Sequence, residues 1–143
     1  MQIRRARPDD ASSLVPLYEQ WGYPQPASDV AQRLALWEAT PQAEVLVAEI
    51  DGALAGMVGV CTTPHLALPG VFARVAGLSV DSAFRRRGVG AALIGAAEEL
   101  ARSWGCDRIE ITSSRSRAEA PSFYPAIGYE DRCARSARFI RSL

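Results

Sequence analysis

The sequence predicts a single α/β domain over residues 1–143, with a central sheet and about four flanking helices. The chain has 143 residues, of which 48% are hydrophobic. This length is enough for one buried core but short for two domains. Apolar, β-rich segments alternate with segments of helical periodicity. Asp51-Gly52 separates two of the β-rich segments, and this dipeptide indicates an antiparallel hairpin.

The expected strands are short and apolar. They cover residues 2–7, 45–50, 53–60, 71–80, 109–112 and 135–140. Pro8 ends the first strand because proline cannot donate a hydrogen bond to a strand ladder. The segment 64–70 reads as a loop, so the second, third and fourth strands should form a meander.

Two short helices should precede the hairpin. The first follows the capping acids at 9–10 and is broken by the turn at 21–26. The second can be capped by Ser28 or Asp29 and stops before Pro41. The order is therefore strand, two helices, hairpin and strand.

The longest helix is expected to begin at Val89 and to stop at Gly105. Its apolar face is predicted to consist of Leu93, Ala97, Leu100 and Trp104. A shorter helix is expected over 119–127, with Gly128 as its terminator. Both helices thus end at a glycine, which readily adopts the left-handed conformation of a helix C-terminus.

The composition excludes several classes of protein. No apolar run approaches the roughly 20 residues that span a bilayer, and no apolar stretch follows the N-terminal arginines to act as a signal peptide. We therefore expect a cytoplasmic protein without a membrane partner. Cys61, Cys106 and Cys133 lack the close spacing of a metal site, so reduced, mostly buried thiols are expected.

Charge is divided unevenly along the chain. The net charge is zero, but residues 1–70 hold eight acids against four arginines, and residues 71–143 hold eight acids against twelve arginines. A small nucleic-acid-binding protein that uses the basic half is a minor alternative, because aromatic interleaving is missing. We expect no nucleic-acid partner.

The loop Arg85-Arg86-Arg87-Gly88-Val89-Gly90 joins an expected strand to the longest helix. Such a turn leaves backbone N–H groups unpaired at the positive end of the helix dipole, where phosphate binds. Its glycines allow close approach and its arginines add charge. No Gly-Lys-Ser/Thr follows, and the three-glycine dinucleotide fingerprint is absent. From these residues alone, a plain strand–helix turn remains the alternative.

Two motifs stand in order in the second half of the chain. They are Arg85-x-x-Gly88-x-Gly90 and, at 123–129, Phe-Tyr-Pro-Ala-Ile-Gly-Tyr. They resemble the Arg/Gln-x-x-Gly-x-Gly/Ala signature and the Phe-Tyr-x-x-x-Gly-Phe/Tyr segment of the GNAT superfamily of N-acetyltransferases. Residues 76–80 are similar to the superfamily's fourth strand. The resemblance implies a mixed, mostly antiparallel, twisted sheet of six to seven strands, with splayed fourth and fifth strands.

The resemblance also implies acetyl-coenzyme A as cosubstrate and no metal. The loop would hold the pyrophosphate, and the pantetheine arm would lie between the splayed strands. The residues carried over to coenzyme binding are Leu78, Ser79, Val80, Arg85, Arg86, Arg87, Gly88, Val89, Gly90 and Ala91.

Tyr124 matches the family's general acid. Acetyl transfer to an amine needs a neutral amine, stabilisation of the oxyanion and a proton for the leaving thiolate. A phenol with a pKa of about 10 can protonate a thiolate whose conjugate acid has a pKa of about 8.5, in a mildly uphill step. A backbone N–H near Leu78 is the expected oxyanion donor. The alternative for Tyr124 is an aromatic plug on its helix.

The general base stays open, because the strand at 71–80 lacks the glutamate that many family members carry there. Glu110 and His65 are weak candidates, because a lone loop histidine is usually just a surface residue, and a water chain is the third solution. Arg115 and Arg117 would contact coenzyme or substrate, or belong to a solvated loop.

The acceptor is expected to be a small or peptide-borne primary amine. The excess of acids in residues 1–70 would attract a cation, and Trp21, Tyr23 and Trp37 surround a proline-rich turn that could line a pocket. Core filling and a homodimer contact are the alternatives for these aromatics. For the whole chain, the alternative is a catalytically silent acyl-coenzyme A sensor or interaction module, and Tyr124 argues against it.

Overall fold

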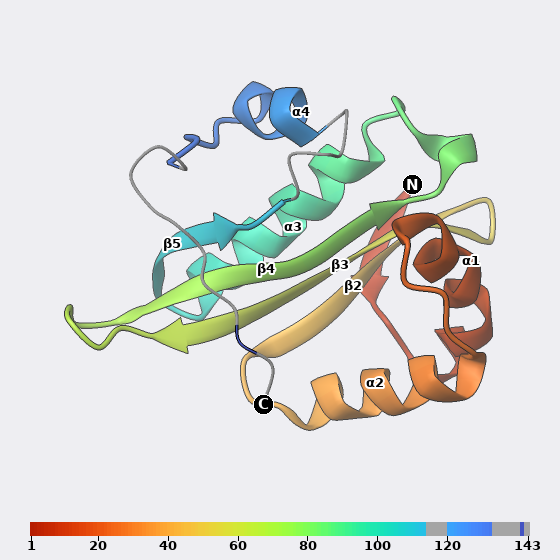
Figure 1. The fold of residues 1–143 in the computed structure, drawn as a ribbon, viewed down its shortest axis with the longest axis horizontal. Helices are drawn as coiled ribbons and strands as arrows, with labels where there is room; N and C mark the ends of the chain where they lie inside the picture. The colour runs from red at the N-terminus through yellow and green to blue at the C-terminus, as the bar shows by residue number, and fades with distance from the viewer. Residues whose placement is uncertain (114–119, 133–140, 142–143) are drawn as a thin grey trace. The chain divides into compact units, whose positions relative to one another are not determined.

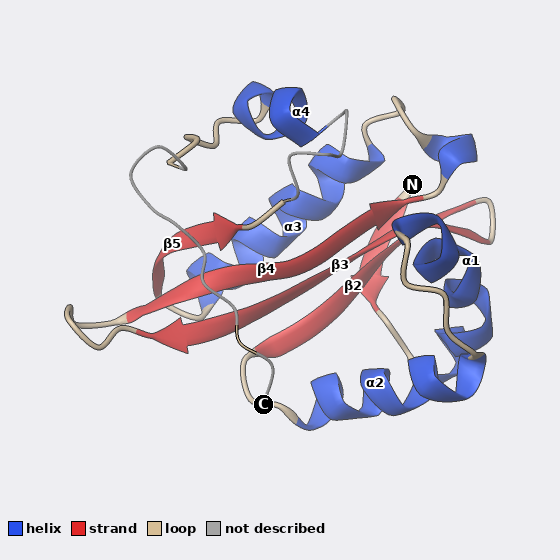
Figure 2. Ribbon diagram, in the orientation of Figure 1, coloured by secondary structure: helices blue, strands red, loops and turns tan. Residues whose placement is uncertain are grey.

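The computed structural model describes residues 1–113, 120–132 and 141, in two units that divide at residues 112 and 113. Figure 2 distinguishes the helices and strands. The strands of the first unit are β1 (Gln2–Arg5), β2 (Ala43–Ile50), β3 (Ala53–Pro64), β4 (Val71–Val80) and β5 (Cys106–Ile111). Its helices are α1 (Ala11–Trp21), α2 (Ala27–Ala39) and α3 (Val89–Ser103), with 3-10 turns η1 (Pro8–Asp10) and η2 (Ser82–Phe84).

The five strands lie side by side in chain order (Figure 1). Only the β4–β5 pair is parallel, so the predicted mixed, mostly antiparallel sheet is confirmed. The hairpin predicted at Asp51-Gly52 is confirmed too, with φ values of 50° and 81° at these residues. The described sheet has five strands rather than six to seven, and the strand expected at 135–140 lies outside the described residues.

A β-bulge interrupts β4 at Ala76. Gly59 of β3 lies opposite Gly77, but its neighbour Val60 lies opposite Val75, so Ala76 is one residue too many on the β4 side. Beyond the bulge, the side chains of β4 exchange faces relative to the earlier part of the strand.

The parallel pairing of β4 with β5 stops at the same place. Its last pair is Val75 with Ile111, yet β4 continues to Val80. A bulge bends its strand, which accounts for the divergence. Within the first unit, the edge of β4 that faces β5 has no strand partner beyond Val75, the pattern expected of splayed strands. We call residues 76–80 on this side the open edge of β4.

Helices cover both faces of the sheet, with α1 and α2 on one face and α3 on the other (Figure 1). Fully buried side chains come from the helices on both faces and from the sheet. Burial of each stabilises the fold by about 1.5–3 kcal/mol relative to leaving it exposed. The largest are Leu14, Leu17, Leu93, Ile94, Val30, Val47, Val58, Val60 and Val89.

The longest helix agrees with its prediction in position and differs in its buried face. It begins at Val89, and Gly105 follows it with a φ of 77°. Its buried residues are Val89, Leu93, Ile94, Ala97 and Ala101. Leu100 and Trp104 are only half-buried, so the predicted apolar face was rotated towards solvent.

The predicted N-terminal caps are wrong. No side chain caps α1, although Asp10 stands at its N-cap position. Pro26 is the N-cap of α2, so Ser28 and Asp29 lie inside the first turn. Asp29 still favours the helix there, because a negative charge near the N-terminus complements the helix dipole.

The second unit contains the helix α4 (Ala120–Ala126). This matches the short helix expected over 119–127 within the described residues. Gly128 ends it with a φ of 96°, as predicted. The Tyr129 N–H reaches back to the Tyr124 carbonyl at 3.0 Å, which satisfies one of the last carbonyl groups of the helix.

Cys61 and Cys106 are free thiols. Both are partly exposed, contrary to the buried thiols expected, and partial burial still raises the pKa of each. Cys133 lies outside the described residues. Within the described ranges, no helix has the length and apolar character that crossing a membrane takes.

Arg4 fastens β1 at the edge of the sheet. Its guanidinium donates to both oxygens of Asp10, at 2.7 and 2.9 Å, and to Glu49 Oε2 at 2.9 Å. Asp10 also accepts the Arg7 backbone N–H at 2.7 Å, and its side chain is 12% exposed. The hydrogen bonds from Arg4 are the main reason that the pKa of Asp10 lies below its ordinary value of 3.8.

Replacement of Asp10 by Asn should lower the free energy of unfolding by about 1–3 kcal/mol at pH 7, because charge-assisted hydrogen bonds are lost. The pKa of Asp10 is lower in the folded than in the unfolded chain. The stabilisation that the Asp10 carboxylate provides is therefore complete when the pH is above the ordinary pKa of 3.8. It disappears as the pH falls through the lower pKa that Asp10 has in the folded chain. Urea denaturation at stepwise lower pH should show the difference between wild type and Asp10→Asn shrinking below about pH 4.

The exposed neighbour Asp9 provides the control, since Asp9→Asn should change stability by less than about 0.5 kcal/mol. A difference between wild type and Asp10→Asn that stays constant with pH would contradict the role given to the Asp10 carboxylate.

Candidate functional site

The open edge of β4 presents backbone groups. The Asp81 N–H donates to the Ala55 carbonyl of β3 at 3.0 Å. Because peptide groups along a strand point alternately to its two sides, the N–H and carbonyl groups of Leu78 and Val80 point away from β3. The Val80 carbonyl accepts a hydrogen bond from Arg85 Nε at 3.3 Å. Among the described residues of the first unit, the peptide groups of Leu78 have no strand partner on this side.

Side chains on this stretch alternate between the two faces of the sheet. Leu78 and Val80 are half-buried on the α3 face. Ser79 points to the opposite face, where its hydroxyl donates to the Leu17 carbonyl of α1 at 3.0 Å. The Ser79 hydroxyl is therefore not at the open edge, where Leu78 and Val80 direct their backbone groups.

The arginine–glycine loop, residues 85–90, follows η2. The φ values of Arg86 and Gly88 are 58° and 79°, both in the left-handed region. This conformation costs a non-glycine residue about 1–2 kcal/mol, so the surrounding loop has to hold Arg86 in place. The side chains of Arg85, Arg86 and Arg87 are exposed, and the Arg87 guanidinium lies 5.3 Å from the centroid of the Phe84 ring.

The N-terminus of α3 leaves backbone donors without acceptors in the helix. Gly88 is its N-cap and offers no side chain. The Ala92 N–H donates to the Gly88 carbonyl at 3.0 Å, so the N–H groups of Val89, Gly90 and Ala91 precede the first intrahelical bond. The Val89 side chain is 1% exposed and covers Gly56, so only its backbone can serve the site.

Trp21, in the last turn of α1, lies against Gly77. A β-carbon on Gly77 would overlap the Trp21 Cη2 atom. Glycine is thus the only residue type at position 77 that lets α1 lie this close to β4 with the Trp21 indole in place. Tyr23 contacts the other side of Trp21, with ring centroids 5.0 Å apart.

Trp37 of α2 occupies the equivalent position one strand away. Gly59 is the cross-strand partner of Gly77, and a β-carbon on Gly59 would lie 3.0 Å from Trp37 Cη2. The two indoles therefore stand over neighbouring glycines on one face of the sheet.

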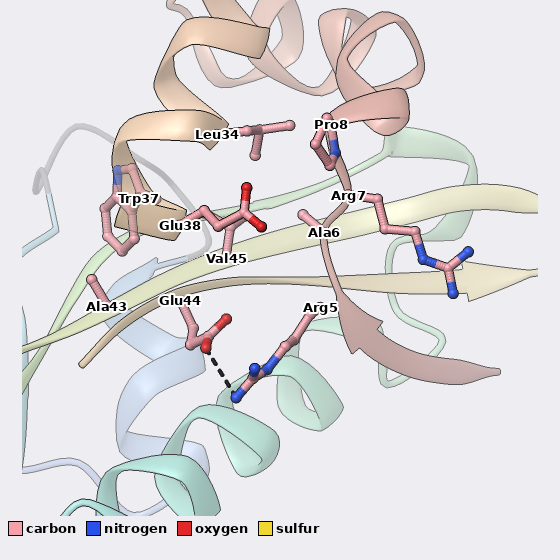
Figure 3. A pocket seen from close by; sticks show the side chains of 10 residues that line it. All are labelled: Arg5, Ala6, Arg7, Pro8, Leu34, Trp37, Glu38, Ala43, Glu44 and Val45. Atoms are coloured by element: carbon pink, nitrogen blue, oxygen red, sulfur yellow. Dashed lines mark ion pairs between the residues drawn. The ribbon is translucent and has the colours of Figure 1, made fainter. Parts of the chain in front are cut away.

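Trp37 also lines a cavity of about 160 Å³ at the β1–β2 side of the sheet (Figure 3). The other lining residues are Arg5, Ala6, Arg7, Pro8, Leu34, Glu38, Ala43, Glu44 and Val45. An ion pair of 3.0 Å joins Arg5 to Glu44. Neither Trp21 nor Tyr23 lines this cavity, so it is not the shared aromatic pocket that the sequence suggested.

Tyr124 lies on α4 in the second unit and is half-buried. Its ring is 5.1 Å from that of Phe123 and 6.0 Å from that of Tyr129, between centroids. An edge-on arrangement of three aromatic rings fixes its orientation within this unit.

Both candidate bases lie beside the first half of β4, before the bulge. His65 is next to the first residue of β4, where its Nε2 lies 3.2 Å from the Asp107 carboxylate and its side chain is 5% exposed. Its side chain is thus buried and partnered, and its ring contacts Phe72, six strand positions before Leu78, which places it roughly 20 Å from Leu78. Glu110 lies beside the bulge, opposite Arg74, and pairs with Arg108 Nε at 2.9 Å.

The remaining predicted contacts, Arg115 and Arg117, lie outside the described residues. Among the residues that are described, no three His, Cys, Asp or Glu side chains form a group that could hold a metal ion.

The contacts that hold this region together could not be predicted from the sequence. Gln20 and Asp81 are hydrogen-bonded but 61 residues apart, so no local pattern connects them. The glycines at 59 and 77 did carry a signal, because glycine within a strand often marks the close approach of another group.

Comparisons with known proteins agree with this fold. The acetyltransferase (GNAT) family matches residues 10–129 of the chain. No curated protein sequence matches it. Among solved structures, a putative acetyltransferase from Agrobacterium tumefaciens str. C58 is 22% identical with a TM-score of 0.87, over 99% of this chain and 100% of that chain.

Two further structures with similar folds are enzymes named for their acceptors. A ribosomal-protein-alanine N-acetyltransferase from Brucella melitensis biovar Abortus 2308 is 22% identical with a TM-score of 0.82, over 99% of this chain and 100% of that one. An aminoglycoside 6'-N-acetyltransferase from Acinetobacter haemolyticus is 18% identical with a TM-score of 0.83, over 100% and 99%. By its family match and its fold, the chain belongs to the GNAT family of acetyltransferases and is an acyltransferase.

Proposed function

We propose that the protein transfers an acetyl group from acetyl-coenzyme A to a primary amine by direct attack in a ternary complex. The observation that carries this proposal is the adjacency of two sets of free backbone donors. The open edge of β4 offers Leu78, and the N-terminus of α3 offers Val89, Gly90 and Ala91. Arg85 links them, because it follows η2 and its side chain reaches back to the Val80 carbonyl at 3.3 Å.

Each set suits one part of the coenzyme. The pantetheine arm carries amides, whose N–H groups can donate to the Leu78 carbonyl along the open edge. The pyrophosphate is anionic, and the uncapped N-terminus of α3 with three exposed arginines favours anions. Gly88 keeps the approach to these donors open, since nothing lies within 4 Å of the place where its β-carbon would be.

The chemistry then needs an oxyanion donor and an acid. The Leu78 N–H is the donor we assign to the oxyanion, because it has no strand partner at the open edge. We assign Tyr124 as the acid that protonates the leaving thiolate. For the base, a water chain suffices, because a primary alkylamine with a pKa of about 10.4 keeps a small neutral fraction at pH 7.

The acceptor in this proposal is a small or peptide-borne primary amine that approaches from the α1 and α2 face. Trp21 is the side chain most suited to meet it, because it lies over Gly77, the residue next to Leu78. An indole face attracts an ammonium ion and buries the alkyl chain behind it. The acceptors for which two of the similar structures are named, a ribosomal protein alanine and an aminoglycoside, are both amine-bearing.

Replacement of Gly88 by Asp should raise the Kd for acetyl-coenzyme A by roughly 100-fold or more, because a carboxylate would face the pyrophosphate. Isothermal titration calorimetry measures this directly. Gly88→Asn is the matched control, since Asn has the same size and tolerates the left-handed backbone, and it should cost about tenfold or less. Wild-type affinity in a folded Gly88→Asp protein would show that the coenzyme binds elsewhere.

Replacement of Tyr124 by Phe should lower kcat by on the order of 100-fold and leave the Kd for acetyl-coenzyme A within about twofold, because only the transferred proton is lost. Thiol release under conditions where chemistry limits the rate gives kcat. Tyr129→Phe removes a neighbouring phenol and should leave kcat nearly unchanged. If both variants keep the wild-type kcat, Tyr124 has only a packing role.

Replacement of Trp21 by Ala should raise the KM for the acceptor by about tenfold and leave the KM for the coenzyme unchanged, because an aromatic contact with the amine is lost. The acceptor is first sought with polyamines, aminoglycosides, amino-acid amides and lysine peptides, by thiol release at several ionic strengths. Trp37→Ala is tested in parallel, and Trp104→Ala, at the end of α3, is the control. A preference for anionic acceptors, or an unchanged acceptor KM in folded Trp21→Ala, would refute this assignment.

A further inference from the structure

The side-chain amide of Gln20 joins the last turn of α1 to the turn that leads out of β4. Its Nε2 donates to Asp81 Oδ2 at 3.0 Å, and its Oε1 accepts the Ser82 backbone N–H at 2.8 Å. These partners are 61 and 62 residues further along the chain. Both halves of one amide are thus used to connect two distant segments.

The chemistry of the partners explains why an amide stands at position 20. The Asp81 carboxylate only accepts hydrogen bonds, and its Oδ1 already accepts the Ala83 N–H at 2.8 Å. The Ser82 N–H only donates. A side chain between them has to donate to one and accept from the other, and a glutamine amide does both, whereas a carboxylate or an ammonium group does one.

The connection lies directly before the arginine–glycine loop. Asp81 is the N-cap of η2, Ser82 is its first residue, and Arg85 follows its last residue. The same turn of α1 also contacts β4 through the Leu17 carbonyl, which accepts the Ser79 hydroxyl, and through Trp21. Of these contacts, only those of Gln20 reach beyond β4 to the start of the loop.

We propose that Gln20 is a positioning residue for coenzyme binding. It holds η2 in a fixed place relative to the open edge of β4. In this way it also positions the arginines at 85–87 and the backbone N–H groups at 89–91. This inference rests on the proposed function, in which that loop receives the pyrophosphate. Loss of the two Gln20 hydrogen bonds should weaken coenzyme binding and raise the KM for the coenzyme. It should leave kcat at saturating coenzyme within about twofold, because Gln20 touches no reacting group.

An exchange of the two side-chain types tests the proposal. Gln20→Glu sets two carboxylates against each other and should raise the Kd for coenzyme A by about tenfold. The double variant Gln20→Glu/Asp81→Asn moves the amide to the other side. The new carboxylate accepts from Ser82 and from the new amide, whose oxygen still accepts from Ala83. It has the net charge of the wild type and should bind coenzyme A within about twofold of it.

Two further variants isolate the cause. Gln32→Glu makes the same charge change at an exposed position of α2 and should leave the Kd unchanged. Gln20→Met removes both hydrogen bonds without adding charge and should weaken binding in the same direction. Hydrogen–deuterium exchange of the peptide that covers 81–90, without ligand, should be faster in Gln20→Glu and Gln20→Met than in the double variant.

The outcomes separate this inference from the function on which it rests. If the wild type does not bind coenzyme A, both fail. If the wild type binds and Gln20→Glu binds equally well, the positioning role alone fails. If Gln20→Glu is weakened and the double variant is not restored, the hydrogen bonds between residues 20, 81 and 82 do not account for the loss, and the positioning role is again refuted. Equal exchange rates over 81–90 in all variants would overturn it as well.

Discussion

A peptide group that leaves its strand ladder has to find another partner or remain available to a ligand, and the bulge at Ala76 creates this condition in β4. The extra residue bends the strand at the point where pairing with β5 ends. From there to Val80, the strand keeps β3 on one side and has an open edge on the other. The free groups of Leu78, and hence the place assigned to the thioester, follow from this one irregularity.

An edge of this kind is useful only if it is held rigidly, and α1 provides much of that support. Ser79 gives its hydroxyl to α1, and Gly77 gives up its side chain so that Trp21 can lie against the strand. Gln20 extends the same support to η2. The helix that would face the acceptor thus also fixes the strand and loop that would face the coenzyme. The two substrates of the proposed reaction meet at one set of contacts.

The sequence predicted those features that depend on neighbouring residues. The turn at Asp51-Gly52, the bounds of β4 and the glycines after α3 and α4 were all correct, because backbone conformation at such positions is decided locally. The helix caps were wrong because Pro26 and the Arg4–Asp10 pair compete with the side chains that usually cap.

Other features depend on contacts between distant segments and could not be read in advance. Leu100 and Trp104 fit a helical stripe, but the position of β3 turns Ala101 and Ile94 inwards instead. The role of Ser79 depends on a carbonyl of α1, 62 residues away, and so a predicted site residue became a structural one. His65 was seen as an isolated loop residue because Asp107 follows it by 42 positions.

The order of the strands has a consequence for how the protein assembles. Each strand pairs with the one that precedes it in the chain, so the sheet can grow along one edge during synthesis, and β5 arrives last, after α3. Until then the whole outer edge of β4 is a template for pairing with other chains. In the finished first unit β5 covers the half before Val75. The half that remains is short and bent by the bulge, which makes it a poor template, so the bulge that opens this edge also disfavours its pairing with other chains.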